Sequence, residues 1–166
     1  VQAWFEEIQR LRSELPREVE TTLRAHEEAG TTDHPDYLAA EHEFYKRHLC
    51  RVDPWPDWLN ECFAVLAANP EVYHSMNGPS EFHVIGTLKD WDITDRLGQI
   101  EAPTLVFSGR YDEVTPAITE AAHRAIRGSE YVVLEESSHT AQAEEPERTL
   151  ELVRDFINRA EGAAAA

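Results

Sequence analysis

Apolar residues in the first half of the chain recur at helical spacing, and no run there has the character of a strand. Between Trp4 and Leu15 they fall three or four residues apart, which predicts a first helix. The same spacing, with prolines and Gly30 as boundaries, predicts four further short helices over residues 16–29, 37–49, 58–68 and 70–76. The third of the five helices, over residues 37–49, is expected to have Thr32 or Asp33 as its cap.

The pattern changes after the Asn-Gly-Pro at residues 77–79. The next seven residues, 80–86, are expected to form a connector with some β character, and Asp92 or Thr94 can cap a short helix after it. Two β-rich apolar runs follow, each succeeded by a stretch with helical character, in the order 103–109, 117–127, 130–134 and 146–159. This order predicts an α/β fold with two parallel strands joined by a right-handed crossover.

Two parallel strands do not make a stable sheet by themselves. Parallel sheets need both faces covered and normally have more strands. The second half of the chain is therefore expected to be half of an α/β domain, whose remaining strands belong to another polypeptide or another fragment.

One acid and one histidine stand just past the ends of the two predicted strands. Asp112 and His139 are 27 residues apart, which suits one strand–helix–strand crossover of roughly 30 residues. Both side chains are then expected at the carboxyl ends of the strands, where α/β proteins place their sites. They would supply two of the three parts of a nucleophile–histidine–acid triad. The alternative is a turn acid and a loop histidine without a common role.

The nucleophile of such a triad has no candidate in the chain. When acid and histidine follow in this order, a serine is expected upstream of both, in a Gly-x-Ser-x-Gly turn. That motif does not occur here. The nucleophile and the oxyanion hole are therefore expected to come from outside this sequence.

Composition and charge disfavour several other classes of function. The 166 residues carry a net charge of −17, which disfavours nucleic acids and anionic membrane surfaces as partners. No apolar run approaches the roughly 20 residues of a membrane span. Cys50 and Cys62 form no Cys-x-x-Cys pair, and the histidines between His26 and His48 place no ligand pair on one helical face, so no metal site is predicted.

Several motifs together indicate a family. They are Cys50–Pro56, Met76–Phe82, Gly86–Thr94, Gly109–Pro116, and Ser137–His139 followed by Glu144–Glu147. By these motifs the chain resembles the carboxyl-terminal half of proline iminopeptidases, which are α/β-hydrolases, over nearly all residues to about 160. The resemblance implies a helical cap inserted before the last two strands of the core. It also implies that the chain begins just after the serine-bearing region, at the entry to the cap.

The resemblance also assigns roles to four side chains. Asp112 matches the acid and His139 the base of the triad. Glu81 and Glu113 match an acidic pair that holds the free amino terminus of the substrate. Two acceptors suit the two N–H donors of a prolyl ammonium. The alternatives are an exposed turn carboxylate for Glu81 and, for Glu113, an acid favoured by a helix N-terminus.

An apolar wall for the pyrrolidine ring is expected in the cap, and three aromatic residues are candidates for it. They are Tyr45, Trp55 and Phe82, and the sequence does not choose among them.

These observations predict a helical cap over residues 1–80, the carboxyl-terminal part of an α/β-hydrolase core over 81–161, and a tail over 162–166. The expected function is that of one component of a serine exopeptidase that releases N-terminal proline, or another small residue, without a metal or organic cofactor. Its expected partners are an amino-terminal fragment that carries the nucleophile and oxyanion hole, and a peptide with a free N-terminus. The expected location is the cytoplasm.

Two other interpretations remain open. One is another hydrolase of the same fold, such as an amino-acid amidase, an esterase or an epoxide hydrolase. The other is a truncated, non-catalytic hydrolase fragment that acts as a binding module.

Overall fold

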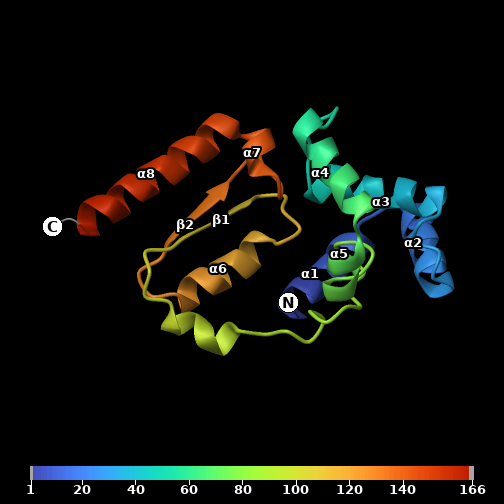
Figure 1. Cartoon of the computed structure of the whole chain (residues 1–166), viewed down its shortest axis with the longest axis horizontal. Helices are drawn as coiled ribbons and strands as arrows, with labels where there is room; N and C mark the ends of the chain where they lie inside the picture. The colour runs from blue at the N-terminus through green and yellow to red at the C-terminus, as the bar shows by residue number, and fades with distance from the viewer. Residues whose placement is uncertain (1, 165–166) are drawn as a thin grey trace.

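The structure is a computed structural model that describes residues 2–164. It has a helical part and an α/β part, which lie at opposite ends of the molecule in Figure 1. The helical part contains the five expected helices, with bounds within two residues of the predictions. They are α1 (Gln2–Ser13), α2 (Arg17–Ala29), α3 (Pro35–His48), α4 (Asp57–Ala68) and α5 (Glu71–Met76).

In the turn between α2 and α3, the end of α2 lies where the sequence predicts it, but the cap of α3 is a different residue from those predicted. Gly30 ends α2 in the left-handed conformation, at φ 66°, which glycine adopts without steric cost. The cap of α3 is His34, whose Nδ1 accepts a hydrogen bond from the backbone N–H of Asp36 at 3.2 Å. The prediction of Thr32 or Asp33 was wrong because Pro35 occupies the first helical position, which makes the residue before it the cap.

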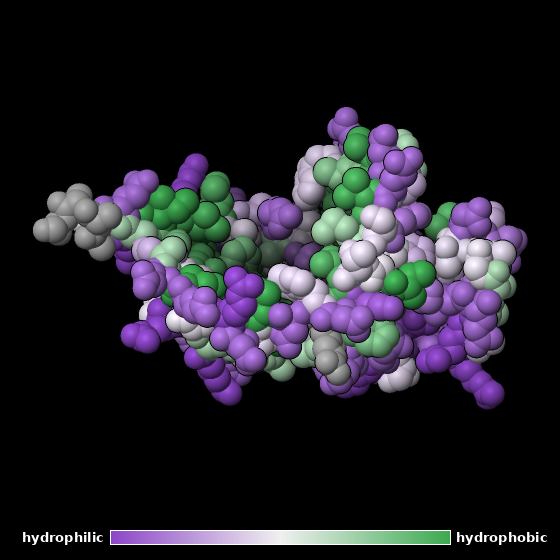
Figure 2. Space-filling view, turned by 60° about the horizontal axis from the view of Figure 1, so that its bottom comes forward, coloured by the Kyte–Doolittle hydropathy of each residue, from purple (hydrophilic) through white to green (hydrophobic). Residues whose placement is uncertain are grey.

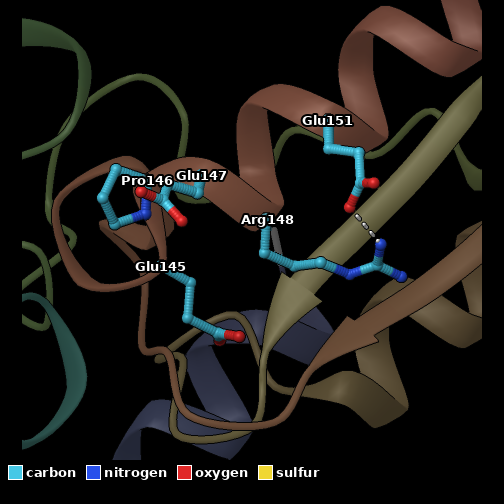
Figure 3. A pocket seen from close by; sticks show the side chains of 5 residues that line it. All are labelled: Glu145, Pro146, Glu147, Arg148 and Glu151. Carbon is cyan, nitrogen blue, oxygen red and sulfur yellow. Dashed lines mark hydrogen bonds and ion pairs between the residues drawn. The ribbon is translucent and has the colours of Figure 1, made fainter.

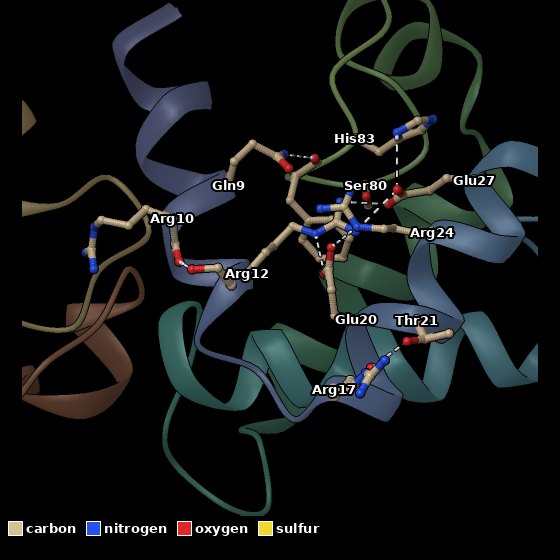
Figure 4. A network of polar contacts seen from close by, with 12 residues as sticks. Gln9, Arg10, Arg12, Arg17, Glu20, Thr21, Arg24, Glu27, Ser80 and His83 are labelled. Atoms are coloured by element: carbon tan, nitrogen blue, oxygen red, sulfur yellow. Dashed lines mark hydrogen bonds and ion pairs between the residues drawn. The ribbon is translucent and has the colours of Figure 1, made fainter.

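The helical part has its own apolar core, which Phe82 joins from beyond α5. The Phe82 side chain is fully buried and packs against the ring of Phe44 at 4.9 Å between centroids. The guanidinium of Arg12 lies 4.9 Å from the centre of the Phe82 ring. Arg12 is also buried, and it is paired with Glu20 and Glu27 of α2 in the polar network of Figure 4. The residue after Glu81 is therefore anchored in the cap core.

The α/β part confirms the predicted order of strands and helices. Its elements are η1 (Thr94–Gln99), β1 (Leu105–Gly109), α6 (Pro116–Ala125), β2 (Glu130–Leu134), α7 (Ala141–Glu144) and α8 (Pro146–Ala164). The two strands are parallel and paired from Leu105 with Glu130 to Gly109 with Leu134. The α/β fold class expected from the sequence is therefore correct.

Three local expectations need correction. Residues 80–86 form turns and contain no strand. The helix α7 was not predicted, because its four residues are too few to show a period. The helix α8 continues to Ala164, into the stretch expected to be a tail, because alanine is the strongest helix former. Residues 165–166 of that expected tail lie outside the described residues.

The core of the α/β part is small. Its buried members are Leu134, Ala141 and Leu152, while Leu105, Phe107 and Val132 of the strands are only partly buried. Figure 2 shows apolar side chains gathered at this end of the molecule. In the described part of the chain the sheet has two strands, so the outer edge of each is unpaired. Among residues 2–164, no helix combines the length and the hydropathy that crossing a membrane requires.

Candidate active site

The turns after β1 and β2 bring Asp112 and His139 into direct contact. The Oδ1 atom of Asp112 lies 2.9 Å from Nδ1 of His139 and also accepts a hydrogen bond from the backbone N–H of Val114 at 2.8 Å. The Asp112 side chain is 7% exposed and the imidazole 47% exposed. Within residues 2–164, Nε2 of His139 has no hydrogen-bond partner. Asp112 thus orients the ring through Nδ1, and Nε2 stays available to accept a proton.

The pKa of His139 is raised to about 9. The hydrogen bond to Asp112 is the largest cause, and the negative charges of Glu113 and Glu81 add to it. These charges stabilise the imidazolium form, which a general base must become during the reaction.

Gly109, the last residue of β1, allows the two turns to touch. A Cβ atom at this position would lie 2.3 Å from the carbonyl oxygens of both Ser137 and Ser138, closer than a real contact allows. The backbone N–H of Tyr111 donates to the Ser137 carbonyl at 3.0 Å. The absence of a side chain at Gly109 is therefore a condition for the approach of Asp112 to His139.

Two glutamates hold the backbone that precedes His139. The carboxylate of Glu144 accepts hydrogen bonds from the backbone N–H of Ser138 at 2.6 Å and from its hydroxyl at 2.8 Å. The carboxylate of Glu145 accepts from the Ser137 hydroxyl at 2.5 Å. Figure 3 shows Glu145 next to the start of α8, apart from the ion pair that Arg148 forms along that helix.

The carboxyl-terminal end of α3 accepts backbone hydrogen bonds from the turns that follow β1 and β2. The carbonyl oxygen of His48 accepts hydrogen bonds from the backbone N–H groups of Glu113 at 3.3 Å and His139 at 3.1 Å. The carbonyl oxygen of Leu49 accepts from the backbone N–H of Thr140 at 2.8 Å. Carbonyl groups at a helix C-terminus lack partners within the helix. The two turns supply these partners and are thereby positioned relative to the cap.

Arg51 adds a second link between the cap and the two turns. Its guanidinium lies 3.8 Å from the centre of the Tyr111 ring and donates to the carbonyl of Glu136 at 3.0 Å. Its backbone N–H donates to Glu144 at 2.7 Å. Neither this role nor that of the α3 carbonyls was predicted, because backbone acceptors leave no signal in a sequence.

Glu113 is buried, and among residues 2–164 its carboxylate forms no ion pair. It is 1% exposed, and its Oε2 atom has no hydrogen-bond partner among the described residues. Burial, followed by repulsion from Glu81, raises the pKa of Glu113 well above its usual range. A buried carboxylate is costly unless it is paired, so this side chain suits a ligand that brings a positive charge.

Glu81 is held in place by a hydrogen bond from a residue of α5. Its Oε1 atom accepts a hydrogen bond from the hydroxyl of Tyr73 at 2.7 Å. The side-chain amide of Asn77 donates to that hydroxyl at 3.1 Å and to the carbonyl of Ser80 at 2.9 Å. Burial and the neighbouring charge of Glu81 raise the pKa of Tyr73, which keeps its hydroxyl protonated as a donor. Glu81 lies near enough for its charge to act on Glu113, and both charges act on His139.

The three aromatic candidates for the apolar wall lie in different surroundings. Tyr45 lines a cavity of 380 Å³ in the cap. Phe82 is fully buried in the cap core and cannot line a pocket. Trp55 lies behind Tyr45, at 6.4 Å between ring centroids, and faces another hollow. The same 380 Å³ cavity is lined by Glu41 and Tyr73, which were not predicted as site residues.

The turn after α2 brings two histidines together. The rings of His26 and His34 stack at 4.7 Å between centroids, and Asp36 is close to both. The Nδ1 atom of His34 already caps α3, and Nδ1 of His26 lies 2.7 Å from the hydroxyl of Thr31. We therefore attribute this exposed group to the helix connection.

The chain is similar to curated proteins and to solved structures. No protein-family model matches the chain. The proline iminopeptidase of Saccharolobus solfataricus is 40% identical to it over 153 residues, which are 92% of this chain and 49% of that protein. The chain spans about half the length of such curated relatives.

Two solved structures resemble the fold closely. The crystal structure of a protein named VinJ matches with a TM-score of 0.93 and 45% identity, over 96% of this chain and 54% of that one. The proline iminopeptidase of Mycobacterium smegmatis matches with a TM-score of 0.85 and 44% identity, over 98% and 54%.

Proposed function

We propose that this chain, which corresponds to the carboxyl-terminal half of proline iminopeptidases and has part of the α/β-hydrolase fold, supplies the base, acid and amine-binding carboxylates of a serine exopeptidase. The observation that carries this proposal is the 2.9 Å contact between Asp112 and His139. Glu113, whose buried carboxylate is incompletely bonded, follows the acid directly in the chain.

The reaction follows from this geometry. Nε2 of His139 accepts the proton of a serine hydroxyl as that oxygen attacks the first peptide carbonyl of the substrate. Asp112 stabilises the imidazolium that forms. His139 then gives the proton to the leaving amine, and the shortened peptide departs. Water hydrolyses the remaining ester and releases the free amino acid.

The glutamate pair selects the substrate by its free amino terminus. Glu81 and Glu113 accept hydrogen bonds from the substrate ammonium, and Oε2 of Glu113 gains the partner that it lacks among the described residues. Holding the ammonium at a fixed distance from the serine places the first peptide bond at the reacting atoms. Proline and other small N-terminal residues are the expected substrates.

The nucleophile and oxyanion hole come from a separate amino-terminal fragment. Three observations support a nucleophile outside this sequence: the absence of Gly-x-Ser-x-Gly from it, the half-length match to the relatives, and the partly exposed strands of the two-stranded sheet. That fragment would pair with the sheet and cover its apolar side chains.

A hydrolysis panel tests the activity. The purified enzyme is offered arylamides of proline, of alanine and of N-acetylproline. We expect cleavage of the two free amines and little cleavage of the blocked compound, because the blocked nitrogen carries no charge. Equal cleavage of all three would contradict the amine anchor and would favour an amidase or esterase of the same fold.

Intact-mass analysis tests the separate fragment. A second polypeptide with a Gly-x-Ser-x-Gly motif, labelled by a serine-reactive fluorophosphonate, is the expected result. A single longer chain that contains both halves would contradict a separate fragment while leaving the proposed chemistry in place. Absence of any labelled serine would indicate a non-catalytic binding module.

A further inference from the structure

The cap contains a cavity whose wall includes Tyr73, the residue that donates a hydrogen bond to Glu81. Its volume is 380 Å³, within the range of about 300–1,000 Å³ that small ligands occupy. Tyr45 and Tyr73 form part of its wall, and the Tyr73 hydroxyl is the group that donates to Glu81. The cavity therefore adjoins the place proposed for the substrate ammonium. Much of the remaining wall is apolar and comes from α3, α4 and the turn before α5, with Leu38, Phe63, Leu66, Ala67 and Pro70. Its other polar members are Thr32, Asp33, Glu41 and His74.

This apolar wall carries a carboxylate of its own. Glu41 lies on α3, one helical turn before Tyr45, and is partly buried. Burial, with a contribution from the charge of Glu81, raises the pKa of Glu41 to about 7. In the part of the chain that the structure describes, none of Glu41, Glu81 and Glu113 forms an ion pair.

One substrate ammonium does not satisfy three carboxylates. Glu81 and Glu113 share the ammonium in the proposed complex, which leaves Glu41 with the Tyr45 hydroxyl as a hydrogen-bond partner but, among the described residues, without a positive charge. The free-energy cost of a partly buried carboxylate falls most when a group with a positive charge pairs with it. Lysine and arginine combine an apolar stem with a charged end. That combination matches a cavity with mostly apolar walls, in which Glu41 is partly buried and the second carboxylate, Asp33, is exposed.

We infer that Glu41 determines specificity, and that the cap cavity takes the side chain of an N-terminal lysine or arginine while Glu81 and Glu113 hold its α-amine. This inference rests on the proposed function, because the cavity becomes a side-chain subsite only if the α-amine lies between Glu81 and Glu113. The enzyme would then release basic amino acids as well as proline.

Binding measurements on the active-site-complete enzyme test the inference. The probes are lysinamide, norleucinamide, which has the apolar stem but no terminal ammonium, and N-acetylnorleucinamide. We expect lysinamide to bind at least about tenfold more tightly than norleucinamide, a difference of about 1.4 kcal/mol. Glu41→Gln should remove most of this preference and weaken lysinamide binding far more than norleucinamide binding. Glu43→Gln is the matched control, since Glu43 lies on the same helix, pairs with Lys46 and is absent from the cavity wall.

The outcomes separate the two proposals. Equal binding of lysinamide and norleucinamide to the unmodified enzyme, or an equal loss of both in Glu41→Gln, would overturn the role of Glu41 alone. Equal binding of norleucinamide and its N-acetyl form would instead contradict the amine anchor on which the inference rests. Preference for lysinamide that persists in Glu41→Gln would also overturn the assignment to Glu41.

Discussion

At the scale of single residues, the contact between Asp112 and His139 controls the protonation of the imidazole. Replacing Asp112 by Asn removes both a charge and the strongest acceptor of the Nδ1 proton. We expect the pKa of His139 to fall from about 9 towards its ordinary value near 6.5. A titration of the histidine signals by NMR measures this. The control is Glu135→Gln, an exposed acid of the same turn that pairs with Arg110.

The same contact makes stability depend on pH. Because the pKa of His139 is raised in the folded chain, its stabilising effect is fully present below about pH 6.5 and is lost as pH rises through about 9. The difference in free energy of unfolding between the unmodified chain and Asp112→Asn should therefore shrink across this range. A difference that stayed constant would mean that the pair contributes no charge interaction.

Glu113→Gln is expected to affect substrate binding more than it affects the imidazole. With Glu113→Gln, KM for a proline arylamide should rise on the order of 10- to 100-fold, because a hydrogen bond to a charged group contributes about 1.5–3 kcal/mol. The pKa of His139 should fall less than in Asp112→Asn, since Glu113 acts on it only through charge. Steady-state kinetics with the complete enzyme checks the first expectation. An unchanged KM would argue that Glu113 is a structural acid.

At the scale of elements, the buried network around Arg12 holds α1, α2 and the turn after Glu81 together. The Arg12 side chain is 3% exposed, and its partner Glu27 is 11% exposed. Removing one partner of a buried ion pair costs about 3–5 kcal/mol, because the other charges remain buried. We therefore expect Arg12→Met to lower the free energy of unfolding by about that amount in a urea titration.

Arg10→Met is the matched control on the same helix. The Arg10 side chain is 51% exposed and pairs with Glu7 and Glu14 at the surface, where such pairs contribute little. Its loss should change the free energy of unfolding by less than about 1 kcal/mol. Similar effects of the two substitutions would show that the network in Figure 4 does not hold the cap together.

At the scale of the whole molecule, the α/β part leaves apolar side chains uncovered. Leu150 and Ile157 of α8 are 49% and 45% exposed, and the strands beside them are only partly buried. Large exposed apolar patches mark sites of interaction. We expect the chain alone to bind the dye ANS, and its fluorescence to fall when the amino-terminal half is added. Unchanged fluorescence on addition of that half would contradict docking on this face.

The order of elements was determined by the sequence. Local periodicity, proline and glycine positions predicted all five cap helices and both strands, because these signals act between residues close in the chain. The crossover rule by itself predicts Asp112 and His139 on one edge of the sheet. The resemblance carried by the motifs added Glu81 and Glu113. The cap of α3 was wrongly predicted because Pro35 takes the first helical position, and the helix α7 was missed because its four residues are too few to show a period.

Only the tertiary structure decided how the site is held and what borders it. The carbonyls of His48 and Leu49, the Arg51 link and the bond from Tyr73 to Glu81 join residues that lie far apart in the chain or act through the backbone. The sequence does not rank Glu41 above the other acids, because burial and the shape of a cavity arise only when three helices pack. The net charge of −17 follows from the composition. The sequence does not show which of the acidic side chains behind that charge are buried.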